Sequence, residues 1–412
     1  MFVTILLLFS LKATIVDKYK GEHLEEMTGK VTGLSRCRRG VSNGDGKSGL
    51  TCGSGVSIIK EETAQAGTDW FCGAEAGISR KLAEGAESMR FNRHRGLAAF
   101  MAGCLLLAGC TRAVPSQSRS GLLLDTTVTI TVYHSQPAPI LDACFRQIAD
   151  FERLFSRTLE GSDVWNLNHA QGQPVTVSEE TARLLRLALD YADKSDGALD
   201  VTIAPVSSLW DFKAADPAVP AAEELKRAAA HVNWKNLRLE GRTAQLLDKE
   251  MAVDLGAVAK GYIADRLEES LRGQGVTSAL INLGGNIVVL GDKNGKAWQV
   301  GIQSPFDEEA LAATLEVRDK TVVTSGTYER SFRKNGVLYH HILDPRTGEP
   351  VRNGLASVTI LADGSMIADA LSTACFVLGE TKGMELIAAT PEAEALFIRE
   401  DGTELRSAGF PR

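Results

Sequence analysis

The stretch "ALINLGGNIVVLG", residues 279–291, decides the fold class. It contains two apolar runs separated by Gly284 and Gly285. A glycine pair between apolar runs favours a two-residue hairpin turn, because both turn positions need a positive φ. A close approach of the backbone to a planar or phosphorylated ligand is the alternative, and the hairpin is favoured. The stretch therefore predicts two neighbouring antiparallel strands.

Working outward from this hairpin, strands and helices follow one another in no regular order. Further strands are predicted at "TTVTITVY" (126–133), "WQVGI" (298–302), "TVVTSG" (321–326), "YHHIL" (339–343), "ASVTIL" (356–361) and "EALFIR" (394–399), and a hairpin at 236–248. Helices are predicted from Pro137, over 179–194, over 366–378 and over 382–389. Without strict alternation of strand and helix, the pattern favours an α+β fold, with mixed or antiparallel sheets and packed helices, over a doubly wound sheet. We expect a single catalytic unit, which can comprise two subdomains.

The beginning of the chain differs from the rest. Residues 1–88 show no sustained helical or strand period, and "MRFNRHRGLAAFMAGCLLLAGC" (89–110) then has a basic start and a short apolar segment. This pattern predicts a secretory signal over 89–109. Its last four residues resemble a bacterial lipoprotein box, in which Cys110 carries the lipid. We therefore expect 1–88 to be a non-native or disordered extension, 110–121 a linker and 122–412 the functional domain. The expected location is the periplasmic side of a bacterial membrane, with the inner membrane favoured.

Charge and cysteine content exclude two classes of protein. The formal net charge is -7 over 412 residues, which argues against a nucleic-acid partner because such a partner requires a basic face. Of seven cysteines, four precede Cys110. Cys144 and Cys375 lie in apolar helical patterns, as buried thiols do. The fold is therefore not expected to depend on disulfides.

The stretch "MAVDLGAVAKGYIADRL", residues 251–267, carries the densest polar patterning. It predicts a strand that ends at Asp254, a turn at Gly256 and a helix over 257–267. At such a corner a carboxylate can be the N-cap of the helix or can hold the polar edge of a ligand. Lys260, one turn into the helix, could contact the same anionic ligand. On the residues alone the N-cap is the favoured interpretation.

Two later segments carry further candidate groups. In "YHHIL" the two histidines lie on opposite faces of the predicted strand, so at most one can point into a site. Neither has a partner at metal-ligand spacing, which argues against zinc. Asp369 and Thr373 are four residues apart on one face of a predicted helix, and such a pair of hard oxygen ligands suits Mg²⁺. The alternative is an aspartate that favours the helix dipole and a threonine that bonds back to the helix.

Five motifs, in this order and spacing, resemble the ApbE family of FAD:protein FMN transferases. They are "DLGAVAKGYIAD", "INLGGNIVVLG", "SGTYERSF", "HHILDPRTGEPV" and "IADALSTACFVLG". The resemblance extends from Leu124 to the C-terminus. It implies Mg²⁺-dependent transfer of the FMN half of FAD to a threonine hydroxyl of another protein, with release of AMP. It also implies that the acceptors are flavin subunits of membrane redox complexes.

The resemblance also assigns individual positions. Flavin-contacting positions fall at Leu124, Ala198, Leu199, Asp200, Asp254, Lys260 and His341, and metal positions at Ala257 (through its carbonyl), Asp369 and Thr373. The general base is expected to be His341 or a carboxylate near Asp369. The chain departs from the family at Leu124-Asp125-Thr126, where Met-Gly-Thr is frequent. It also lacks an aromatic residue near Arg157, where one often stacks on the flavin.

Two rival functions remain open at this level. Some relatives hydrolyse FAD to FMN and AMP with the same kind of metal site, so water would replace the acceptor threonine. A flavin-binding lipoprotein of the periplasm without turnover is the other rival. The Asp369 and Thr373 pair argues against it, because binding alone does not require a metal on the diphosphate.

Overall fold

The computed structural model describes residues 56–57 and 114–412. Its strands are β1 (Val56–Ser57), β2 (Ser116–Leu123), β3 (Thr126–Tyr133), β4 (Val175–Thr176), β5 (Leu237–Glu240), β6 (Thr243–Leu246), β7 (Ala279–Leu283), β8 (Asn286–Leu290), β9 (Trp298–Gln303), β10 (Leu311–Val317), β11 (Lys320–Gly326), β12 (Ser331–Lys334), β13 (Val337–His340), β14 (Leu355–Ala362), β15 (Ala393–Arg399) and β16 (Glu404–Arg406). Its helices are α4 (Pro137–Phe155), α5 (Asp163–Asn168), α6 (Glu179–Lys194), α7 (Ala204–Ser207), α8 (Ala222–Ala229), η1 (Trp234–Asn236), α9 (Ala259–Gly273), α10 (Ser365–Leu378) and α11 (Glu380–Ala388).

The central feature is an eight-stranded sheet in the order β16-β15-β14-β11-β8-β7-β3-β2, in which every neighbouring pair is antiparallel. The predicted hairpin lies in its middle, with Leu283 opposite Asn286. Both turn glycines have positive φ, +61° at Gly284 and +89° at Gly285. The α+β class with antiparallel sheets is confirmed.

The sheet is apolar on both faces because it separates two cores. Along β8, Val288 and Leu290 belong to the larger core, whereas Ile287 and Val289 belong to a second core that also contains Trp298 of β9. This alternation follows from the two-residue repeat of a strand. It explains why apolar residues occupy successive positions in both runs of the opening hairpin.

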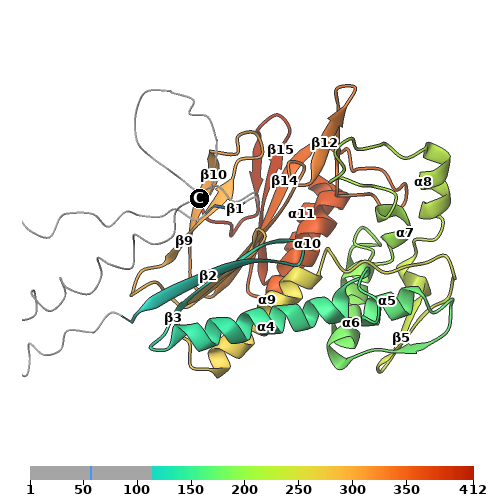
Figure 1. Ribbon diagram of the computed structural model, residues 1–412. Helices are drawn as coiled ribbons and strands as arrows, with labels where there is room; N and C mark the ends of the chain where they lie inside the picture. The colour runs from blue at the N-terminus through green and yellow to red at the C-terminus, as the bar shows by residue number, and fades with distance from the viewer. Residues whose placement is uncertain (1–55, 58–113) are drawn as a thin grey trace, which may run out of the picture. The chain divides into compact units, whose positions relative to one another are not determined.

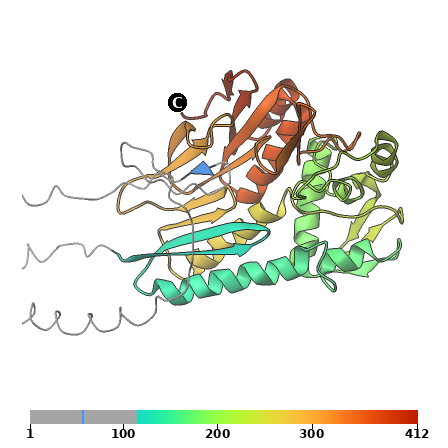
Figure 2. The same ribbon diagram turned by 45° about the horizontal axis from the view of Figure 1, so that its top comes forward.

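Helices α4, α9 and α10 cover the face of the sheet that bounds the larger core, with β9 and β10 on the other face (Figures 1 and 2). Helix α4 has a buried stripe from Ile140 to Phe155, and α10 is buried almost throughout. Helices α9 and α10 pack directly against each other. The candidate residues of both helices therefore come close together.

Residues 163–250 form a smaller group of elements, with the three-stranded sheet β4-β6-β5 and helices α5, α6, α7 and α8. Apolar residues of this group, such as Leu167, Leu185 and Leu246, belong to the same core as those of the large sheet. Helices α5 and α6 and the three-stranded sheet therefore extend the main core.

Three local predictions are wrong. The expected linker over 110–121 is too long, because β2 begins at Ser116; Ser118 and Ser120 are bonded to threonine hydroxyls of β3, so a polar edge strand resembles a linker in composition. The strand expected to end at Asp254 is reduced to an isolated bridge between Ala252 and Ile203. The strand expected over 339–343 ends at His340.

The predictions for the cysteines and for the beginning of the chain have mixed outcomes. In the described residues Cys144 and Cys375 are free and buried, as expected. None of the helices in the described residues is long and apolar enough to cross a membrane. Cys110 and the signal over 89–109 lie outside the described residues, as does the extension over 1–88 apart from β1.

Candidate active site

Asp254 lies shortly before helix α9 and is not the N-cap of that helix. The backbone N–H of Asp254 donates to the carbonyl of Val201 (2.8 Å), and its Oδ1 accepts from the N–H of Gly256 (2.9 Å). Helix α9 begins two residues later than predicted, at Ala259, and its N-cap Val258 makes no side-chain bond. The N-cap interpretation of Asp254 is therefore wrong, and the carboxylate is available for another role.

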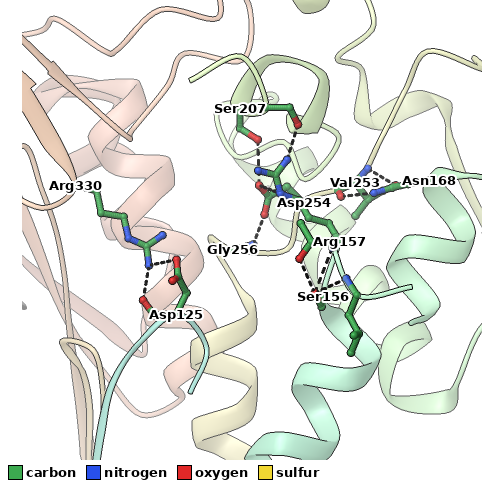
Figure 3. Close-up of polar contacts among 12 residues, drawn as sticks. Asp125, Ser156, Arg157, Asn168, Ser207, Val253, Asp254, Gly256 and Arg330 are labelled. Carbon is green, nitrogen blue, oxygen red and sulfur yellow. Dashed lines mark hydrogen bonds and ion pairs between the residues drawn. The ribbon is translucent and has the colours of Figure 1, made fainter. Parts of the chain in front are cut away.

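The other oxygen of Asp254 belongs to a polar network from two other elements (Figure 3). Ser207, the last residue of α7, donates its hydroxyl to Oδ2 (3.1 Å), and Nε of Arg157 lies 3.4 Å from the same oxygen. Arg157 also donates to the hydroxyl of Ser208 (2.6 Å). This network fixes the carboxylate in one orientation. No local sequence pattern predicts the contacts of Arg157 and Ser207 with Asp254, because both are remote from it in the chain.

The segment Ala198–Asp200 is buried and continues into Val201, which bonds the backbone of Asp254. Asp200 uses its carboxylate locally. Oδ1 accepts from the backbone and hydroxyl of Thr202, and Oδ2 from the N–H of Trp234 (2.9 Å). Burial raises the pKa of Asp200, and these bonds oppose the rise. The assigned flavin segment therefore lies beside Asp254, while the Asp200 side chain holds a loop.

The closest meeting of two candidate segments is at Asp369 of α10. Its Oδ2 accepts from the backbone N–H of Gly261 (2.8 Å), so it contacts the first turn of α9 next to Lys260. Burial raises the pKa of Asp369 to about 6, and the charge of Lys260 opposes this. Thr373 lies one helical turn further along α10 and is partly buried, and Ala257 lies in the turn that leads into α9.

The crossing of α9 and α10 requires glycine at position 261. A Cβ there would lie 2.3 Å from the carbonyl oxygen of Ser365 and 2.7 Å from Cβ of Asp369. Gly261→Ala should therefore lower the free energy of unfolding by about 2–3 kcal/mol, as overpacking does. It should also lower activity, because Asp369 has to move.

Urea unfolding of Gly261→Ala and Gly273→Ala checks this prediction. Gly273 is in the same helix and has open space around it. Alanine there should be neutral or stabilising, because it is the better helix former. Equal urea midpoints for Gly261→Ala and wild type would contradict the close crossing.

The hairpin β12–β13 positions His341. Its register pairs Ser331 with His340, so the residues just outside it, Arg330 and His341, are neighbours at its base. His340 is buried and points elsewhere, with Nε2 3.0 Å from the carbonyl of Val351. The sequence predicted that at most one of the two histidines points into a site, and here the two rings have different partners.

The hydrogen bond of His341 defines its tautomer. Nδ1 lies 3.2 Å from the backbone carbonyl of Glu329. A carbonyl oxygen can only accept, so Nδ1 carries the hydrogen and Nε2 is left with a lone pair. Burial, together with the charges of Arg330 and Lys260, lowers the pKa of His341 to about 3. The imidazole is therefore neutral at physiological pH and has the form that a general base requires.

The turn between β2 and β3 contacts Arg330 at the base of the hairpin β12–β13. Leu124 and Asp125 both have positive φ (+54° and +60°), and Glu152 of α4 accepts the N–H of Leu124 (3.0 Å). Asp125 forms an ion pair with Lys213. It forms a second ion pair with Arg330 (Figure 3). The pair with Arg330 is 3.5 Å long, and both side chains are about half exposed.

Arg330 itself has a φ of +36°, in the left-handed region. A non-glycine residue there costs about 1–3 kcal/mol and is frequent at functional sites. Exposed ion pairs contribute about 0–1 kcal/mol. The pair with Asp125 therefore does not offset the strain at Arg330.

The structure thus brings together several of the residues that the sequence singled out. Lys260 is close enough to affect the pKa of both His341 and Asp369, and Glu329 also affects Asp369. Within the part of the chain that the structure describes, no group of three or more His, Cys, Asp and Glu side chains could hold a metal. A metal here would need ligands from a backbone carbonyl, a hydroxyl or the substrate itself. Such a sparse oxygen set suits Mg²⁺.

The chain matches the model of the ApbE family over residues 124–397. It is 38% identical to an FAD:protein FMN transferase of Treponema pallidum (strain Nichols), over 72% of this chain and 88% of that protein. A transferase of the same name from Klebsiella pneumoniae (strain 342) is 36% identical, over 68% and 88%. Among solved structures, the ApbE protein of Thermotoga maritima superposes with a TM-score of 0.66 at 33% identity, over 71% of this chain and 97% of that one. The flavin transferase ApbE of Vibrio cholerae has a TM-score of 0.66 at 32% identity, over 72% and 98%.

Proposed function

The chain belongs to the ApbE family, and from that premise we propose that it transfers FMN from FAD to a protein and releases AMP. The finer proposal is that transfer depends on Mg²⁺ and that the acceptor is a threonine hydroxyl. The observation that carries it is the meeting of α9 and α10, where Asp369 contacts the N–H of Gly261 beside Lys260. One basic side chain, one buried carboxylate and one neutral imidazole are the groups that phosphoryl transfer to a hydroxyl needs.

The carboxylate of Asp369 suits a magnesium ion, and Ala257 and Thr373 are its proposed further ligands. Asp369 is buried with a raised pKa, and its Oδ2 already accepts from Gly261, which leaves Oδ1 as the candidate ligand atom. The Ala257 carbonyl and the Thr373 hydroxyl would complete a set of hard oxygen ligands. When bound, the ion neutralises charge on the diphosphate.

Groups of this chain can assist each step of the proposed reaction. The acceptor hydroxyl oxygen attacks the phosphorus on the FMN side, and a new P–O bond forms as the bond to the bridging oxygen breaks. AMP leaves with that oxygen, and the hydroxyl proton passes to Nε2 of His341. Lys260 offsets negative charge on the phosphates. Asp254, held by Arg157 and Ser207, orients the dinucleotide.

One experiment separates the three functions. The mature protein is incubated with FAD, Mg²⁺ and a flavin subunit of a membrane redox complex, and AMP and the acceptor's mass are followed. AMP together with an acceptor heavier by one FMN group supports the transferase. AMP with free FMN would identify a hydrolase, and the absence of AMP would identify a flavin carrier.

The membrane location is a separate part of the proposal. It is supported by the signal over 89–109 and by the cysteine at position 110. We expect a mature protein that begins at a lipidated Cys110 and stands on the periplasmic side of the inner membrane. Mass spectrometry of the N-terminal peptide checks this, and an unmodified Cys110 inside a longer chain would contradict it.

A further inference from the structure

Arg330 lies at the base of the hairpin that carries the proposed base. The pairing of Ser331 with His340 places Arg330 and His341 just beyond the paired ends of β12 and β13, and the Glu329 carbonyl contacts the His341 ring. Tyr328 anchors this turn. Its ring occupies the space where Gly326 would carry a Cβ, 2.4 Å from that position. The position of Arg330 is therefore set by the same contacts that set His341.

The charges of two cations from different elements act on His341. Arg330 comes from the turn between β11 and β12, and Lys260 from the first turn of α9; His340 is the other titratable group near the ring. A general base must become positively charged during the reaction, and two neighbouring cations oppose that change. An anion bound to both cations would remove this opposition. The diphosphate of FAD is an anion of the required kind.

Asp125 contacts the side chain of Arg330 from the turn between β2 and β3. Its carboxylate and its backbone carbonyl both contact the guanidinium of Arg330, and Lys213 pairs with the same carboxylate. Asp125, itself paired with Lys213, therefore holds the Arg330 side chain from a segment that is distant in sequence. The pair is long and half exposed, so one face of the guanidinium can form other bonds.

We propose that Arg330 binds the diphosphate of FAD beside His341, and that Asp125 is the residue that positions Arg330. This inference rests on the proposed function, because it takes the ligand to be FAD. A guanidinium binds phosphate oxygens in pairs and keeps its charge at all physiological pH values. Bound diphosphate would offset the charges of Arg330 and Lys260, so the imidazole becomes a stronger base when the substrate is present.

The test is FAD affinity, measured by flavin fluorescence in EDTA with the full-length protein. Arg330→Ala should weaken binding about 10- to 100-fold, since a hydrogen bond to a charged group is lost. Arg330→Lys should recover part of the loss because it keeps the charge. Asp125→Asn preserves the left-handed turn that asparagine tolerates, and it should weaken binding by a smaller factor, about threefold. Arg333→Ala is the matched control, since Arg333 is an exposed residue of the same hairpin.

The outcomes separate binding from folding. Melting temperatures are measured in parallel, and unchanged values with the expected order of affinities support the inference. Affinity within twofold of wild type for Arg330→Ala would overturn it. Equal losses in Arg330→Ala and Arg333→Ala, or a loss in Arg330→Ala that lysine does not reduce, would also overturn it. A failure of the proposed function would instead appear as missing AMP release by the wild-type protein, which this binding assay does not use.

Discussion

Asp369→Asn should lower kcat/KM for FMN transfer about 10³-fold, because charge stabilisation by a bound metal is worth several kcal/mol and each 1.36 kcal/mol is a factor of ten. The asparagine oxygen can still accept the N–H of Gly261, so the contact between α9 and α10 persists. A neutral amide, however, is a poor ligand for Mg²⁺. The variant should therefore stay folded and lose its response to added Mg²⁺.

Steady-state AMP release over a range of Mg²⁺ concentrations measures this effect. Asp363→Asn is the control, because Asp363 lies just before α10 and pairs with Lys320 at the surface. It should remain within twofold of wild type. Full Mg²⁺-dependent transfer by Asp369→Asn would show that the metal assignment is wrong.

His341→Gln should lower kcat about 10²- to 10⁴-fold, the contribution of a positioned general base. The reason is that the free Nε2, which the Nδ1 contact to the Glu329 carbonyl leaves unprotonated, is replaced by an amide. FAD binding should change much less than kcat. His134→Gln is the control, because His134 lies outside the hairpin β12–β13.

Two further readouts distinguish a base from a merely structural histidine. Added imidazole should partly restore transfer by His341→Ala, since a small base can take the vacated place. In the protein without FAD, the NMR signal of His341 should not titrate between pH 5 and 8. The pKa of His341 is lowered to about 3, so the ring is already neutral above that value. A titration near pH 6.5 would contradict this environment.

Much of the fold could be predicted from the sequence because its main elements have strong periodic patterns. The strand over 126–133 and the helix over 179–194 appear in the structure with the predicted bounds. Elements without an apolar stripe were missed. Strand β2 is mostly exposed and polar, and α5 has six residues. Their positions depend on hydrogen bonds to neighbours that are distant in the chain, which a local pattern does not contain.

The candidate site could be predicted only as a set of residue types. Spacing along one helix suggested the Asp369 and Thr373 pair, but not that Asp369 bonds to Gly261, which lies 108 residues earlier. The roles assigned to all of these site residues stay predictions, those of Leu124, Ala257 and Thr373 included. The family often has an aromatic residue near Arg157, and this chain has none there. In the structure, the guanidinium of Arg157 contacts Asp254 and Ser208. A charge partner from another element has no signature in the local sequence.

Strand β2 has a consequence for where such an enzyme could work. Only five residues separate Cys110 from Ser116, the first residue of β2. Even a fully stretched chain of that length reaches about 20 Å. If a lipid holds Cys110 in the bilayer, the enzyme is tethered with Ser116 within about 20 Å of the membrane. It would then meet acceptors by lateral diffusion in a plane, and proteins whose target loops rise higher above the membrane would escape modification.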